Sequence, residues 1–398
     1  MSTAVSGRPR RLNAVLRQTE RVTPLELFFD LVFVLALTQC TALMAADPTW
    51  RGLAQGVLVL GVLWWSWVGY AWLTSVVDPE EGSVRIAMFA AMAALLVAAL
   101  CVPEAFDELG LLFACAYAVV RAAHIALFLL AATDDPALRT SVVGLAASSA
   151  LGVGLLIGAS LTDGVGQGML WLIALLLDMG GPYLFGSEGW KLAPSHFAER
   201  HGLIVIIALG ESIVAIGVGS EAGVDAGVVL AATFGIGIAA ALWWLYFDVV
   251  ALLSEHHLAT IPPGRERNEL ARDSYSYLHF PMIAGIVFGA LGLKKTLADV
   301  WDPLDLVPAA AILGGTAIYL LAHVAFRFRH IRTVNNHRLV AALVALALIP
   351  AAIEIPAVAT VALVFAVLVV LIALEAVRFA GSRERARQRI MDEAVAPE

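Results

Sequence analysis

Residues 196–219 read HFAERHGLIVIIALGESIVAIGVG, an apolar run of membrane-spanning length with one carboxylate, Glu211, near its middle. A charged side chain at the centre of a bilayer is costly, so such a group faces the protein interior and has a partner. Gly210 and Ser212 flank this acid, and small residues let neighbouring helices approach closely. The stretch predicts a transmembrane helix packed among others, with Glu211 as its functional candidate.

The composition places the whole chain in the membrane. Of its 398 residues, 60% are hydrophobic and 15% charged, and the mean hydropathy is +0.85. The net charge of −8 argues against a nucleic-acid partner, so the expected partners are membrane lipids and a small solute or ion. The three cysteines show no CxxC spacing, and no P-loop, dinucleotide or zincin motif occurs, which predicts neither a metal site nor a cofactor.

The apolar segments fit an all-α polytopic protein with about twelve transmembrane helices. A helix needs roughly 20 apolar residues to cross the hydrocarbon core. Clusters of Pro, Gly, Asp and Arg separate the segments from one another. The expected spans are 24–46, 52–76, 84–102, 109–132, 139–161, 168–186, 199–219, 226–252, 272–293, 305–326, 338–355 and 357–380.

The basic residues predict that both termini lie in the cytoplasm. Cytoplasmic loops of membrane proteins carry an excess of Lys and Arg. With both ends inside, Arg51, Lys294 and Lys295 fall on the outer side and Arg121 falls within the fourth span, while the rest of the 25 basic residues fall inside. We therefore expect a multi-pass membrane protein with both ends in the cytoplasm.

The two halves of the chain resemble each other weakly and in the same order. The stretch LELFFDLVFVLALTQ from Leu25 matches AERHGLIVIIALGE from Ala198, and LWWSWVGY from Leu63 matches LWWLYFDV from Leu242. A third match places His124 opposite His323. These matches predict two six-helix repeats of the same orientation. The expected organisation is a cytoplasmic tail 1–23, a first repeat 24–186, a linker 187–198, a second repeat 199–380 and a basic cytoplasmic tail 381–398.

Glu211 and Arg121 are the predicted partners at the membrane midplane. Each is the thirteenth residue of its expected span, so the two are expected at the same depth. A buried acid of this kind could exchange a proton, or the pair could act as a gate. The alternative is a static ion pair that specifies helix packing.

A second group of candidates lies towards the cytoplasmic side. Glu26 and Asp30 are four residues apart and share one helix face. A proton relay or cation site could be formed by these acids together with Glu199, Asp178, Asp248, Glu375, His124 and His323. The alternative for Glu26 and Glu199 is that they bind amides at helix starts or inner-loop arginines.

Two further sequence patterns receive structural interpretations. His196, Glu199 and His201 resemble metal ligands, but His201 falls off the face that the other two share, so no metal site is expected. Five deep tryptophans are expected to pack between the repeats: Trp64, Trp65, Trp67, Trp243 and Trp244.

Two segments resemble the hallmark sequences of the low temperature requirement A (LtrA) family of bacterial membrane proteins. They are TPLELFFDLVFVLALTQ, residues 23–39, and HFAERHGLIVIIALGESIVAIG, residues 196–217. The resemblance covers nearly the whole chain and implies a bacterial inner-membrane protein linked by its family's name to growth in the cold. The matching positions are Glu26, Phe29, Asp30, Glu199, Arg200, Gly202, Gly210 and Glu211, whereas His201 stands where an aromatic residue is expected.

The repeat and the midplane acid favour a secondary transporter, with protons as the candidate coupling ion, over an enzyme. Two alternatives stay open. One is a membrane-embedded enzyme acting on lipids, suggested by the inner Asp, Glu and His residues. The other is a non-catalytic sensor or scaffold that responds to the state of the bilayer. The sequence assigns no substrate, coupling ion, transport direction or oligomeric state.

Overall fold

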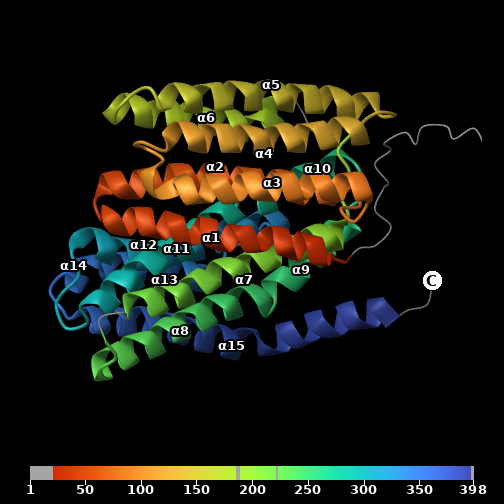
Figure 1. Ribbon diagram of the computed structural model, residues 1–398. Coiled ribbons are helices and arrows are strands. Elements are labelled where there is room, and N and C mark those ends of the chain that lie inside the picture. Colours follow the sequence, from red (N-terminus) through yellow and green to blue (C-terminus); the bar gives the residue numbers. More distant parts are fainter. Residues whose placement is uncertain (1–20, 185–188, 221–222, 396–398) are drawn as a thin grey trace, which may run out of the picture.

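The structure is a computed structural model that describes the backbone of residues 21–184, 189–220 and 223–395, with side chains up to Arg378. All regular elements within these ranges are helical, and Figure 1 shows the long helices lying side by side in one bundle. Residues 1–20 of the predicted N-terminal tail, residues 187–188 of the predicted linker and residues 396–398 lie outside the described residues.

The first half of the chain forms six long helices and one short 3-10 turn. Their bounds are α1 Pro24–Ala46, α2 Trp50–Thr74, α3 Gly82–Cys101, η1 Val102–Glu104, α4 Gly110–Ala131, α5 Pro136–Ala159 and α6 Gly164–Leu184. These bounds agree closely with the first six predicted spans.

The second half is less regular. Its elements are α7 Pro194–Gly219, α8 Ala226–Phe247, α9 Val250–Thr260, α10 Arg265–Ala271, η2 Arg272–Tyr277, α11 His279–Ala298, α12 Leu306–Ile331, α13 Asn336–Ala347, α14 Ile349–Ala352 and α15 Ala357–Val395. The η2 segment is a π-helix, an uncommon form that often marks a functional position.

Eleven helical stretches of the described chain are long and apolar enough to span a membrane. The predicted span 338–355 is the exception, because it forms the 12-residue α13 and the four-residue α14. Pro350 lacks an amide hydrogen and cannot continue an α-helical ladder, which explains why the helix is broken here. The prediction of about twelve full spans is corrected to eleven long helices and this shorter, broken one.

The broken segment still carries the chain back along the bundle. Pro303 and Pro356 form an isolated bridge, so the loops before α12 and α15 lie together. α12 therefore leads away from this end, and α13 and α14 lead back to it. Figure 1 accordingly shows the start of α1 and the end of α15 at the same end of the bundle.

Local sequence signals explain where the helices begin. Thr23 and Glu26 form a capping box at the start of α1, with Pro24 in the first turn. Asp135 caps α5 by accepting a hydrogen bond from the amide of Leu138, and this bond lowers the pKa of the Asp135 carboxyl. The side chain of Asp225 caps α8 in the same way.

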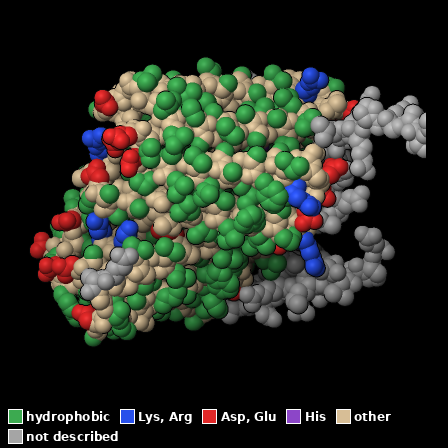
Figure 2. All heavy atoms as spheres, in the orientation of Figure 1, with side chains coloured by type: hydrophobic (Ala, Val, Ile, Leu, Met, Phe, Trp, Pro, Cys, Tyr) green, Lys and Arg blue, Asp and Glu red, His purple; other side chains and the backbone are tan. Residues whose placement is uncertain are grey.

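The surface of the bundle matches a membrane environment. Figure 2 shows hydrophobic side chains over the middle of the visible face, with acidic and basic side chains gathered at its two ends. Large apolar residues on the long helices are exposed, among them Ile86, Leu151 and Val229. Since water would penalise such a surface, it fits contact with lipid.

Helix packing follows a similar order in both halves. α1 packs against α2 and α3, α3 against α4, α4 against α5, and both α5 and α2 against α6. In the second half, α7 packs against α8 and α11, α11 against α12, α12 against α13, and both α13 and α8 against α15. The halves meet where α1 packs against α7 and α11.

Candidate functional site

Matched pairs of polar residues face each other where α1 meets α7. Glu26 and Asp30 are four residues apart on α1, and His196 and Arg200 are four residues apart on α7. Residues at this spacing lie on one face of a helix. All four are completely buried, with a relative exposure of 0%. We call these four residues the α1–α7 ion network.

The guanidinium of Arg200 binds both carboxylates. Its Nη1 donates to Glu26 Oε1 at 3.1 Å, and its Nη2 donates to Asp30 Oδ1 at 2.7 Å. Trp67 of α2 also donates its indole N–H to Asp30 Oδ1, at 2.8 Å. The other oxygen of Asp30 is buried and has no hydrogen-bond partner among the described residues. One buried cation therefore joins two buried acids.

His196 completes the network on the side nearest the starts of α1 and α7. Its Nε2 lies 2.8 Å from Glu26 Oε1, and its Nδ1 lies 3.2 Å from the hydroxyl oxygen of Ser75. Glu26 Oε2 accepts hydrogen bonds from the amide and hydroxyl of Thr23 at the start of α1. Glu26 is thus both a helix cap and an ion-pair partner of an arginine, and both contacts are of the kind that the sequence offered as the alternative to a proton relay or cation site.

The formal charges of the α1–α7 ion network do not cancel without a proton. Two carboxylates face one guanidinium, so these four residues are neutral together only when His196 or one of the carboxylates carries an additional proton. Uncompensated charge in a buried site is strongly unfavourable. The arrangement can therefore bind a proton, or stay neutral by binding a positively charged group.

Glu199 has the capping role that the sequence offered as its alternative. Its carboxylate accepts a hydrogen bond at 3.1 Å from the amide of Val22, just before α1. This contact ties the start of α7 to the start of α1.

The predicted pair of Glu211 with Arg121 is wrong. Arg121 of α4 donates to Asp178 of α6 at 2.8 Å. Ser149 of α5 and Tyr117 of α4 also donate to this carboxylate. The two predicted partners have similar depth in their helices, but α4 packs within its own half while α7 packs against α1, α8 and α11. Depth alone could not reveal this difference.

Glu211 instead contacts Thr38 of α1. The hydroxyl oxygen of Thr38 lies 2.5 Å from Glu211 Oε2. The acid is 2% exposed, so it is shielded from its surroundings as the sequence predicted, but its partner is neutral. The site belongs to the same α1–α7 boundary as the ion network, further along both helices.

The predicted inner cluster separates into distinct networks. His323 of α12 contacts Arg338 of α13 at 2.8 Å, and Arg338 binds Glu375 of α15 at 3.0 Å. The other histidine of the predicted pair, His124 of α4, lies against Gly69 of α2, and both of its ring nitrogens lack a partner among the described residues. Asp248 caps the end of α8 and is half-buried. The two histidines therefore do not share one site.

The tryptophans divide by helix. Trp64, Trp65 and Trp67 of α2 are buried, and Trp64 donates to the backbone oxygen of Ser276 in η2 at 2.8 Å, so α2 packs between the halves as predicted. Trp243 and Trp244 of α8 are 44% and 43% exposed. The prediction for these two is wrong, because α8 lies towards the outside of the bundle and turns them outward.

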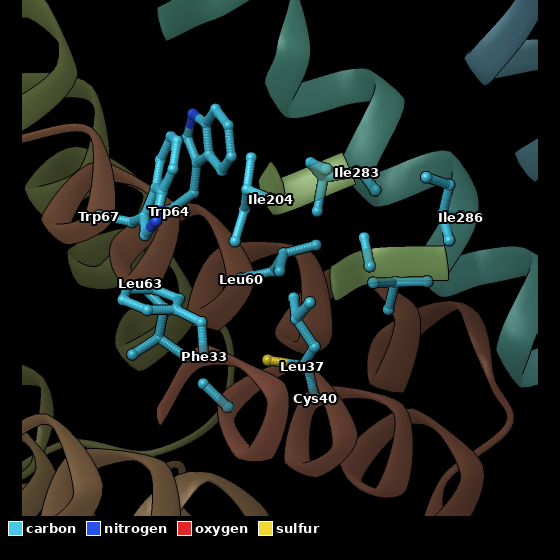
Figure 3. Close-up of a cluster of buried hydrophobic side chains, with 14 of the residues drawn as sticks. Phe33, Leu37, Cys40, Leu60, Leu63, Trp64, Trp67, Ile204, Ile283 and Ile286 are labelled. Carbon is cyan, nitrogen blue, oxygen red and sulfur yellow. The ribbon is translucent and has the colours of Figure 1, made fainter. Parts of the chain in front are cut away.

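A hydrophobic layer separates the α1–α7 ion network from Glu211. Figure 3 shows side chains of α1, α2, α7 and α11 meeting in this layer, among them Phe33, Leu37, Leu60, Ile204 and Ile283. Each of these five is at most 3% exposed. Arg200 and Glu211 lie eleven residues apart on α7, which is about 16 Å along the helix axis. The boundary between the halves thus contains two polar sites, the α1–α7 ion network and the contact of Glu211 with Thr38, with an apolar layer between them.

A small apolar cavity of about 40 Å³ lies beside α2. Trp65, Trp72 and Trp190 line it, together with His124 and Arg272. Within the described part of the chain, no group of three or more His, Cys, Asp and Glu side chains is arranged to hold a metal ion. His201, one of the residues considered for a metal, packs against Phe197, Trp67 and His279 as an aromatic ring would.

Sequence reasoning did not identify Arg200 and His196 as the partners of Glu26 and Asp30. The signal was present, because both pairs have a spacing of four residues near the start of two related helices. The sequence gives the face and depth of each pair, but not the contact between segments about 170 residues apart.

Comparison with known proteins gives two matches. The family model described as bacterial low temperature requirement A protein (LtrA) matches residues 21–373. An uncharacterized protein of Rhizobium meliloti (strain 1021), RA0937, is 33% identical over 316 residues, which cover 76% of this chain and 76% of that protein. No solved structure matches the chain significantly.

Proposed function

The chain belongs to the bacterial low temperature requirement A (LtrA) family, and we propose that this membrane protein is a secondary transporter whose two halves move against each other at the α1–α7 boundary. The observation that carries the proposal is the ion network of Glu26, Asp30, Arg200 and His196. Its acids come from one half and its bases from the other, and it is entirely buried.

Because of this placement, any separation of α1 from α7 changes the pairing of the buried charges. Separating α1 from α7 would leave buried charges without partners, at a cost of about 3–5 kcal/mol for a broken pair. A proton on a carboxylate, or a charged solute entering the gap, would lower that penalty. Binding of either one would therefore favour a different packing of the halves, which is the requirement for coupling in a two-state protein.

The repeated order of helix packing supports the same proposal. Six packing contacts of the first half have counterparts in the second, and each half has a buried arginine paired with an acid on its last long helix: Arg121 with Asp178, and Arg338 with Glu375. We assign these two pairs to holding each half rigid. Parallel repeats that rock around a site near their interface are a common transporter design.

We further propose that the protein lies in the cytoplasmic membrane with both ends inside. Among the described residues, Arg85, Arg139 and Lys191 flank loops at the end where α1 begins, which favours this orientation. The solute is then a small molecule or ion exchanged across that membrane.

The test uses purified protein in liposomes that contain a pH-sensitive dye. A protein-free extract of small bacterial metabolites is added outside. Wild-type protein is expected to change the internal pH when the extract is added, and Asp30→Asn is expected to reduce this response at least tenfold. The matched control is Asp135→Asn, because Asn also caps a helix and Asp135 lies in a loop. Absence of a response with wild type, or an equal response with Asp30→Asn, would contradict the proposal.

A further inference from the structure

We propose that Glu211 and Thr38 form a proton-binding site in the membrane core. In this site the threonine hydroxyl forms a hydrogen bond with the acid both when the acid is protonated and when it is ionised. The inference also assigns the proton as the coupling ion, and in this respect it rests on the proposed transport function. The binding of the proton is a separate property that can be measured without transport.

The hydroxyl of Thr38 lies within hydrogen-bond distance of two acceptor oxygens but can donate to only one of them at a time. Its Oγ1 lies 3.0 Å from the backbone oxygen of Val34 and 2.5 Å from Glu211 Oε2. A hydroxyl group has one hydrogen to donate, although its oxygen can also accept. When Glu211 is ionised, the hydroxyl can donate this hydrogen either to Val34 O or to Glu211 Oε2, but not to both.

When Glu211 carries a proton, the carboxyl group, the Thr38 hydroxyl and the backbone oxygen of Val34 can all be hydrogen-bonded at once. The protonated carboxyl donates its hydrogen to Thr38 Oγ1, and the hydroxyl donates its own hydrogen to Val34 O. When the proton leaves, the hydroxyl rotates and donates to the carboxylate, while Val34 O keeps the hydrogen bond of the helix. Both states are hydrogen-bonded, so the site can gain and lose a proton without leaving a buried polar group orphaned.

Among the described residues, no charged side chain forms an ion pair with Glu211. On α1, the hydroxyl of Thr41 donates to the backbone oxygen of Leu37 and also lies near Glu211, and Cys40 is buried beside Thr41. On α11, Lys294 acts on Glu211 over a longer distance. An ionised Glu211 therefore lacks the compensation that Arg200 gives to Asp30, and a proton supplies it.

The other helices packed against α7 bring no further charge to this level. α2 carries Arg51 at its outer start and Tyr70 near its opposite end, where Tyr70 binds the backbone of Val120. On α8, Tyr246 contacts His279. The acid and histidines of α9, Glu255, His256 and His257, follow α8 near the level where α7 begins.

The oxygens of the site favour a proton over a metal cation. A cation entering a dry site needs enough oxygen ligands to replace its hydration shell. The side-chain oxygens at the site are the Glu211 carboxylate and the hydroxyls of Thr38 and Thr41. The Thr41 hydroxyl also donates to the backbone oxygen of Leu37. Three side chains are too few to replace the hydration shell of a sodium ion and are sufficient for a proton.

The experiment is infrared difference spectroscopy of the protein in phosphatidylcholine bilayers during steps of pH. Carbonyl bands of protonated carboxylic acids are expected to appear and disappear with pH in wild type. Glu211→Gln should remove the band of Glu211, which subtraction of the two spectra isolates from the bands of other acids such as Asp30, and the control Asp135→Asn should leave this Glu211 band unchanged. Circular dichroism first verifies that each variant keeps the helicity of wild type. Identical carbonyl bands in wild type and in the folded Glu211→Gln variant would overturn the inference.

Thr38 is tested by a matched pair of variants. Thr38→Val removes the hydroxyl and should shift the Glu211 band, whereas Thr38→Ser keeps the hydroxyl and should preserve it. An unshifted band in Thr38→Val would contradict the shared role of the hydroxyl. Replacing choline by sodium at constant pH should have no effect, and a sodium-dependent loss of the band would overturn the choice of the proton.

The outcome is separable from that of the liposome test. Transport in wild-type liposomes without a Glu211 band would refute this inference and leave the proposed function in place. A Glu211 band without transport would refute the function and leave the proton site in place.

Discussion

Arg200 is the residue on which the boundary between the halves depends most. Its guanidinium reaches two carboxylates at once, and its planar set of donors suits this geometry better than the single ammonium of lysine. The guanidinium also donates to the hydroxyl of Thr74 and lies over the ring of Trp67, both on α2, so three helices are joined at one side chain.

Replacing Arg200 by Met is expected to destabilise the folded protein by about 3–5 kcal/mol, because Glu26 and Asp30 would be left buried without their cation. Arg200→Lys should lose less. The measurement is thermal unfolding in detergent, followed by tryptophan fluorescence.

The double variant Arg200→Met with Asp30→Asn tests whether the loss comes from this pair. It should recover part of the stability, since one of the two uncompensated acids is then neutral. For comparison, Arg265→Met removes an exposed pair with Glu269 and should change stability by about 0–1 kcal/mol. Equal losses for Arg200→Met and Arg265→Met would contradict the role given to Arg200.

At the scale of the helix, the sequence predicted most spans and failed where a span is broken. Apolar length and capping residues located α1 to α6 to within a few residues. Between α12 and α15 the apolar composition continues through Pro350, so hydropathy predicted a full span where the backbone forms α13 and α14. Arg121 and Glu211 are both buried, as predicted for charged residues of these helices, but their partners depend on which helices are neighbours.

Close helix contact depends on glycine where α11 crosses α12. A Cβ atom on Gly285 would lie 2.5 Å from the backbone oxygen of Gly315, whereas one on Gly289 would meet no atom within 4 Å. Gly285→Ala is therefore expected to destabilise the protein by about 1–3 kcal/mol through overpacking. Gly289→Ala, on the same helix, should be neutral or slightly stabilising.

The two glycine variants are compared by the temperature at which each precipitates from detergent solution. A loss of stability in both would indicate a general intolerance of α11 rather than the close crossing. No loss in either would contradict the packing of α11 against α12.

For the whole molecule, the orientation in the membrane is a prediction that chemical labelling can test. Single cysteines are introduced at Asp302, in the loop before α12, and at Asp134, in the loop before α5, after replacement of Cys40, Cys101 and Cys115. A membrane-impermeant maleimide should label Asp302→Cys in intact cells, and Asp134→Cys after the membrane is opened. The reverse pattern would invert the topology.

The proposed duplication is supported in the sequence only by an order of weakly similar segments. The packing of α7 with α8 and α11 parallels that of α1 with α2 and α3, in support of that order. The polar contacts differ between halves, because His124 lacks the arginine bond that His323 makes with Arg338. Sequence similarity of this strength cannot reveal such differences, since they depend on single side chains.

The central claim is that a proton gradient drives a solute across the membrane through the α1–α7 boundary. Liposomes containing the protein are given a pH difference in the presence of the metabolite extract, and their contents are identified by mass spectrometry. We predict that at least one solute accumulates inside above its external concentration, that a protonophore abolishes the accumulation, and that Glu211→Gln abolishes it as well. Accumulation of no solute, or accumulation that is indifferent to the gradient, would contradict the claim.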